Sequence, residues 1–150
     1  MKLLECVNPV KGRWRLRWDV QEAEGGCSYM EEEYDHRPTM DEVRACIVGW
    51  HNRRTAEAIL SGMTWEGDMV WLSQENQCNY KAAYDLAVQS NGANLPYRVK
   101  LGSDEAPVYR TFETVEEIGA FYRAVAGHIQ TSIEEGWARK DRIDWSQYLE

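Results

Sequence analysis

Hydrophobic and polar residues alternate strictly along residues 13–20. Three arginines occupy the odd positions, and the apolar even positions are Trp14, Leu16, Trp18 and Val20. Because successive side chains of a strand point to opposite faces, this period of two predicts a half-buried β-strand. A turn-forming Glu-Gly-Gly sequence follows at 24–26, and residues 29–35 then place acids at odd positions. The pattern predicts a second strand and an antiparallel hairpin.

One register of this hairpin satisfies the charges and the core together. The arginines and the acids both lie at odd positions. If the numbers of directly opposed residues add up to an even sum, opposite charges therefore lie on one face. The same register places Trp14, Leu16 and Trp18 beside Met30 and Tyr34 on the other face. We therefore expect the arginines to be neutralised within the hairpin, rather than to bind phosphate or an acidic partner.

Capping sequences mark the starts of three predicted helices. Thr39 with Glu42, and Thr114 with Glu117, have the spacing of capping boxes, and Ser73 provides a single cap. The predicted helices cover residues 40–60, 74–90 and 115–140. The apolar stripe of the second consists of Tyr80, Ala83, Tyr84, Ala87 and Val88.

Two further hairpins are predicted between the helices. Residues 63–72 are typical of a tight hairpin that turns near Gly67-Asp68. Residues 97–101 and 108–112 alternate again, with Tyr97, Val99 and Leu101 facing inward. The predicted fold class is therefore α+β: antiparallel β-hairpins with three helices, the C-terminal helix longest.

The segment 62–73 offers the best place to divide the chain. We expect a hairpin-plus-helix module over residues 1–62 and an α+β module with the long C-terminal helix over residues 63–150. The two modules can be separate or can together form one compact domain.

The long helix carries apolar residues at intervals of three and four. This spacing fits a heptad seam between helices, and equally a long helix packed on its own sheet. Two aromatic residues follow the helix, which indicates a tail docked on this chain or on a neighbour. The candidate interaction residues are Ile118, Tyr122, Val125, Ile129, Trp137, Trp145 and Tyr148.

Composition narrows the classes of partner. The formal net charge of −8 argues against nucleic-acid binding and against an anionic membrane surface. No stretch approaches the roughly 18 apolar residues of a membrane span, and residues 1–6 do not have the pattern of a signal peptide. Seven Trp and eight Tyr supply aromatic area of the kind enriched at protein interfaces and in cores.

The sequence contains no pattern of catalytic or metal-binding chemistry that we recognise. The four cysteines form no C-x-x-C pair or zinc spacing, and we expect free thiols. The three histidines, His36, His51 and His128, fall on three different predicted elements without an adjacent nucleophile. We therefore predict no catalytic residue, no cofactor and no metal, and a protein that is not an enzyme.

A resemblance covers residues 63–145. The hairpin motif Trp65-x-Gly67, the polar run from Ser73 to Gln77 and the Ala-rich helix after it resemble a domain of unknown function in bacteriophage tail-fibre and tail-associated proteins. The segments 96–99, 112–117 and 121–122 resemble its continuation of two strands and a long helix. That family has no assigned activity, so the resemblance implies no catalytic residues.

The resemblance implies a phage or prophage protein of the tail, baseplate or fibre. It would act by protein–protein contact, as a structural subunit or as an assembly adaptor, with other tail or fibre proteins and further copies of itself as partners. Its place would be the virion tail or the host cytoplasm. The alternative is a cytosolic, host-directed binding adaptor or regulator without catalytic activity.

Overall fold

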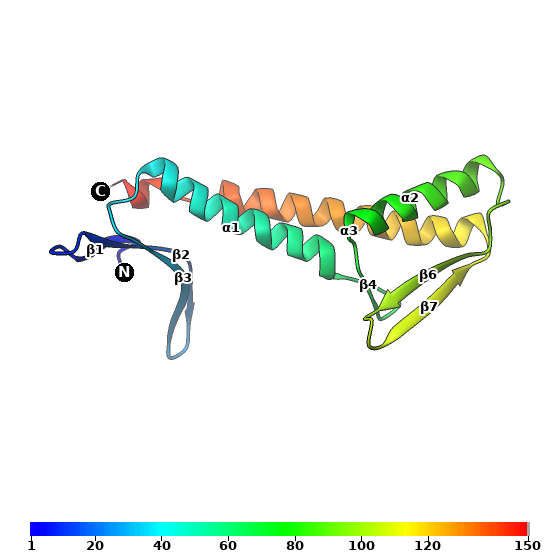
Figure 1. Cartoon of the computed structure of the whole chain (residues 1–150), viewed down its shortest axis with the longest axis horizontal. Coiled ribbons are helices and arrows are strands. Elements are labelled where there is room, and N and C mark those ends of the chain that lie inside the picture. The colour runs from blue at the N-terminus through cyan, green and yellow to red at the C-terminus, as the bar shows by residue number, and fades with distance from the viewer. Residues whose placement is uncertain (150) are drawn as a thin grey trace. The chain divides into compact units, whose positions relative to one another are not determined.

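The computed structural model describes residues 1–149 and has the predicted α+β fold, with antiparallel hairpins and the C-terminal helix longest (Figure 1). The chain forms two compact units. Unit 1 joins residues 1–52 to residues 139–150, and unit 2 comprises residues 53–138. The elements are β1 Leu4–Asn8, β2 Arg13–Ala23, β3 Gly26–Tyr34, α1 Met40–Ser61, β4 Met63–Trp65, β5 Asp68–Val70, α2 Gln74–Gln89, β6 Tyr97–Gly102, β7 Pro107–Phe112, α3 Val115–Asp141 and the 3₁₀ turn η1 Trp145–Tyr148.

The predicted register of the first hairpin is confirmed. Leu16 pairs with Glu32 and Trp18 with Met30, so the pairing sum is even as expected. Beyond Trp18 the register shifts, and Asp19 takes a positive φ of 52° at the irregularity. A third strand, β1, pairs with the other side of β2. The sequence did not predict β1, because its five residues show no alternation.

Ion pairs line one face of this sheet, as the charge pattern predicts. Arg17 lies 2.9 Å from Glu5 and 3.6 Å from Glu31, and Arg15 lies 3.3 Å from Glu33. The hydrogen bond to Glu33 is the main cause that raises the pKa of Arg15 above its ordinary value. The Arg17 side chain is only 11% exposed, whereas Arg15 and Glu33 are more open to solvent, and exposed ion pairs contribute little to stability, typically about 0–1 kcal/mol. Their main effect here is therefore to favour one register over another.

The opposite face of the sheet forms the core of unit 1. Leu16 and Trp18 are buried against Val43 and Ile47 of α1. The capping box at the start of α1 is present, because Thr39 Oγ1 accepts from the Glu42 amide at 3.2 Å and Glu42 accepts from the Thr39 amide at 3.2 Å. The C-terminal tail docks on this chain.

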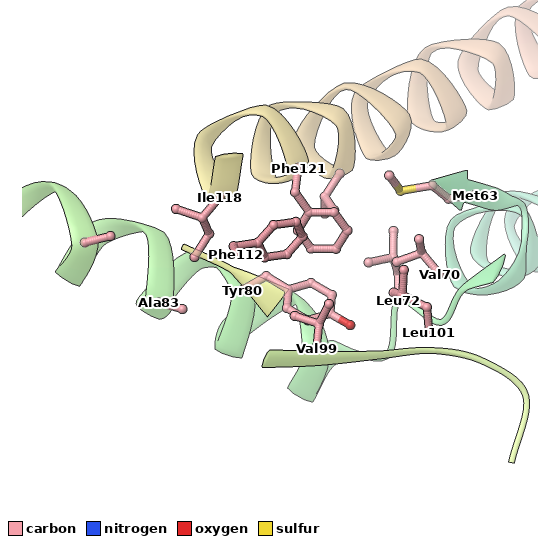
Figure 2. Packing of buried hydrophobic residues seen from close by; sticks show 12 residues of the cluster. Met63, Val70, Leu72, Tyr80, Ala83, Val99, Leu101, Phe112, Ile118 and Phe121 are labelled. Atoms are coloured by element: carbon pink, nitrogen blue, oxygen red, sulfur yellow. The ribbon is translucent and has the colours of Figure 1, made fainter. Parts of the chain in front are cut away.

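The core of unit 2 gathers around one aromatic side chain, Phe121 of α3 (Figure 2). Its ring lies 5.0 Å from that of Phe112, 5.1 Å from Tyr80 and 5.5 Å from Trp65, measured between centroids. These partners come from β7, α2 and β4, so a single side chain joins three other elements of the unit. Arg110 of β7 pairs with Glu66 and Asp68 and so ties the β6–β7 hairpin to the β4–β5 hairpin.

Three local predictions differ from the structure. The β4–β5 turn is centred on Glu66-Gly67, one residue before the predicted position, because both residues adopt positive φ there. Val88, placed on the apolar stripe of α2, is 52% exposed. The division of the chain falls within α1 and near the end of α3, instead of at 62–73, because the tail packs on the N-terminal sheet.

We expect Phe121→Ala to lower the free energy of unfolding by about 3–5 kcal/mol, since it removes a ring that is 1% exposed and leaves a cavity. Urea denaturation followed by circular dichroism measures this. Val88→Ala on exposed α2 is the control and changes the free energy by less than about 0.5 kcal/mol. A loss below about 1 kcal/mol for Phe121→Ala would contradict the central position of this ring.

Candidate functional site

The structure does not bring the seven sequence-predicted interaction residues together on one open surface. Ile118 and Val125 are buried in the core of unit 2, and Ile129 and Tyr122 pack partly against it. The Tyr122 ring stacks on that of Tyr84 at 5.1 Å. The apolar spacing of this helix fitted either a seam with another helix or packing within its own fold. For these residues the structure shows packing within unit 2.

The remaining three predicted residues differ in exposure. Tyr148 is buried in unit 1, where its hydroxyl donates to the Arg17 carbonyl at 3.1 Å, and Trp145 is partly buried beside it. Trp137, by contrast, is 55% exposed on α3. A role in partner contact stays a prediction for all seven, and Trp137 is the member that is most accessible to a partner.

The outer part of the β2–β3 hairpin is the most exposed strand structure in the described chain. We call residues 20–30 the ribbon. All of them are exposed, and they include three hydrophobic side chains, Val20, Tyr29 and Met30. Figure 1 shows the tip of the ribbon extending away from β1 and α1 within unit 1. The ribbon therefore presents both faces of a two-stranded sheet to solvent.

The edges of the ribbon are open as well. In the three-stranded sheet, β3 is an outer strand, and β1 pairs with β2 only as far as Leu16. One further backbone bond joins the Arg17 amide to the Leu3 carbonyl at 2.7 Å. Along residues 20–23, no strand of the described chain pairs with the outer edge of β2. The ribbon carries two glutamates and no lysine or arginine, so it is locally acidic.

The spacing of the two predicted strands already indicates the ribbon. The two predicted strands, 13–20 and 29–35, leave eight residues between them, whereas β-hairpin loops usually have two to five. With the Glu24-Gly25-Gly26 turn in the middle, the excess indicates that both strands continue. The structure shows that they do, to Ala23 and from Gly26.

Unit 2 contains a hollow of about 470 Å³ between β5, the start of α2 and β6. The aromatic residues Trp71, Tyr80 and Tyr97 contribute to its lining, and so do the cations Arg98 and Lys100. Trp71 is 44% exposed, whereas Tyr80 is 5% exposed and lies at the base. No sequence pattern marks these residues as a site, because the elements that carry them are separate along the chain.

The histidines are each engaged in structural contacts. His36 Nδ1 lies 2.7 Å from Asp35 and Nε2 lies 2.8 Å from Glu42, so both ring nitrogens face carboxylates. These two hydrogen bonds raise the pKa of His36 and lower the pKa values of Asp35 and Glu42. His128 Nε2 contacts the Ala58 carbonyl at 2.8 Å, and His51 is buried with its ring against Trp50.

Residues 1–149 contain no group of three or more His, Cys, Asp or Glu side chains placed to hold a metal ion. Cys6, Cys27 and Cys78 are exposed thiols, and Cys46 is partly buried. No helix in this part of the chain is long and apolar enough to cross a membrane.

Comparison with known proteins adds no relative. No family model matches the chain, and neither a curated protein nor a solved structure is found to be similar to it. The resemblance to the phage tail-associated family therefore stays a prediction.

The burial of α3 leads to a paired prediction. We expect Val125→Asp to unfold unit 2, because it places an uncompensated charge at a site that is 1% exposed. Trp137→Asp, on the same helix, should leave the circular dichroism spectrum and the unfolding midpoint nearly unchanged. A folded Val125→Asp protein that only loses its oligomeric state would show that Val125 lies at an interface instead.

The His36 contacts lead to a pH-dependent prediction. The raised folded-state pKa of His36 contributes stability that is fully present below the unfolded value of 6.5 and is lost as the pH rises through the folded value. Between about pH 6 and about pH 9, the unfolding midpoint should therefore fall more in the wild type than in His36→Gln. A ¹H–¹⁵N NMR titration should place the midpoint of His36 above that of a model histidine peptide. Equal slopes in both proteins would contradict the prediction.

Proposed function

We propose that this protein acts by binding another protein, and that the ribbon is one of its contact surfaces. The observation that carries the proposal is that residues 20–30 form two paired strands with both faces and both edges exposed. The three exposed hydrophobic side chains of this short segment add apolar area that a partner would bury.

The physical argument concerns the stability of such a structure in water. A two-stranded hairpin on its own is marginally stable at best, because it buries little apolar surface. Open strand edges also present unpaired amide and carbonyl groups, which readily pair with another chain. A partner that covers the ribbon supplies both the missing burial and the missing hydrogen bonds. The two glutamates favour a partner surface with basic residues.

As the biological setting we propose a phage tail. The protein would be a structural subunit or an assembly adaptor of the tail, baseplate or fibre, with other tail proteins and its own copies as partners. The support is the resemblance over residues 63–145 together with the exposed ribbon. In such an adaptor, the ribbon would be an element that contacts a neighbouring subunit.

The ribbon proposal is tested by site-specific cross-linking in cells that produce the phage. With a photo-reactive amino acid at Val20 or at Met30, we expect a cross-link to a tail, baseplate or fibre protein, or to a second copy of the chain, identified by mass spectrometry. The matched control carries the same group at Val88, an exposed position on α2. The expected cross-link is absent or much weaker there.

The outcomes separate the two parts of the proposal. Cross-links from the ribbon to host proteins alone would overturn the tail assignment and support the host-directed alternative. No cross-link beyond the level of the Val88 control would overturn the ribbon as a contact surface. Mass spectrometry of purified particles then distinguishes a subunit, present at defined copy number, from an assembly adaptor, which is present in the lysate and absent from particles.

A further inference from the structure

The hollow of unit 2 lies along an open strand edge. The β6–β7 sheet has only two strands, and β5 lies near β6 without joining the sheet. In the described chain, β7 is the only segment to which β6 is joined by backbone hydrogen bonds. The lining of the hollow runs along β6 from Tyr97 to Lys100 and continues at Gly102, and it also includes Met69 and Trp71. The free edge of β6 therefore borders the hollow.

A tyrosine hydroxyl group in the lining of the hollow lacks an intrachain partner. Tyr80 is 5% exposed, and its hydroxyl makes no hydrogen bond with any residue in 1–149. The ring of Tyr80 is buried, whereas its hydroxyl oxygen stays open to the hollow, where the backbone of a bound ligand can reach it. Burial raises the pKa of Tyr80, with a smaller effect from Tyr97, so the group stays protonated and can donate to an acceptor such as a carbonyl.

The walls of the hollow differ in chemistry. The exposed Trp71 indole offers an apolar surface on one side. On the other side, Arg98 lies over the Tyr109 ring at 4.1 Å and has no carboxylate partner among the described residues, whereas Lys100 is paired with Asp104 at 2.7 Å. The site thus offers one apolar contact and one uncompensated cation.

We infer that this hollow binds an extended peptide segment of a partner protein, which adds to the free edge of β6 as a third strand. The backbone of the peptide pairs with β6, and one of its carbonyl groups accepts from the Tyr80 hydroxyl. An apolar side chain of the peptide packs on Trp71, and an acidic side chain pairs with Arg98. A volume of about 470 Å³ lies within the range of about 300–1,000 Å³ that is usual for binding sites.

This site is separate from the ribbon. It lies in unit 2, whereas the ribbon belongs to unit 1, and the inference depends only on residues of unit 2, namely the edge of β6, Trp71 and Tyr80. The two contact surfaces can therefore be tested one at a time in the full chain.

The experiment uses peptides selected from a display library of random dodecapeptides against the full-length chain. In ¹H–¹⁵N spectra, the selected peptide should shift the amide signals of Tyr97–Gly102 and slow the hydrogen exchange of alternate β6 amides. We expect Trp71→Ala to weaken binding at least about tenfold, and Arg98→Gln to weaken binding of acidic peptides. Both side chains line the hollow outside the buried core, so both variants should fold, and Val88→Ala is the control.

Backbone methylation of the peptide is the decisive measurement. An N-methyl group at alternate peptide residues removes the amides that pair with β6, so binding should be lost in one methylation series and kept in the other. Equal binding of both series would overturn strand addition, and so would amide shifts that map outside the hollow. Failure to select any peptide, together with binding of glycans on an array through Trp71, would assign the hollow to carbohydrates instead.

Discussion

A slip of one residue between β2 and β3 would turn Leu16 and Trp18 toward the charged face of the first sheet and would turn three arginines toward its core. This constraint fixes unit 1. Arginines and acids pair on one face, and the apolar residues pack under α1 on the other, so both faces select the same register. The position of β1 also depends on this strand, because β1 pairs with β2.

Periodic features were predictable from the sequence because they depend on neighbours within a few residues. The alternation of residues 13–20, the capping boxes at Thr39 and Thr114 and the three helices are of this kind. The predictions failed where distant segments decide the outcome. Val88 has helical spacing but is 52% exposed, and β1 becomes a strand only because β2 provides a template.

The candidate sites show the same limit. The apolar stripe on α3 fitted a contact surface and a core position equally well. Only the packing around Phe121 assigns Ile118 and Val125 to the interior. The hollow joins residues from β5, α2 and β6, which are brought together by the fold and by no local pattern. Exposure of the ribbon, by contrast, could be inferred in part, since the distance between its two strands exceeds the length of a turn.

The docking of Tyr148 on the Arg17 carbonyl joins positions 131 residues apart in the chain. During synthesis the N-terminal sheet emerges from the ribosome long before the tail that completes its core, whereas residues 53–138 form a continuous stretch that can pack as soon as it is exposed. The part of the molecule that is made first is therefore completed last. Until the tail emerges, the apolar face of the sheet stays incompletely covered beside the open edges of the ribbon, and this interval favours early association with a partner or a chaperone.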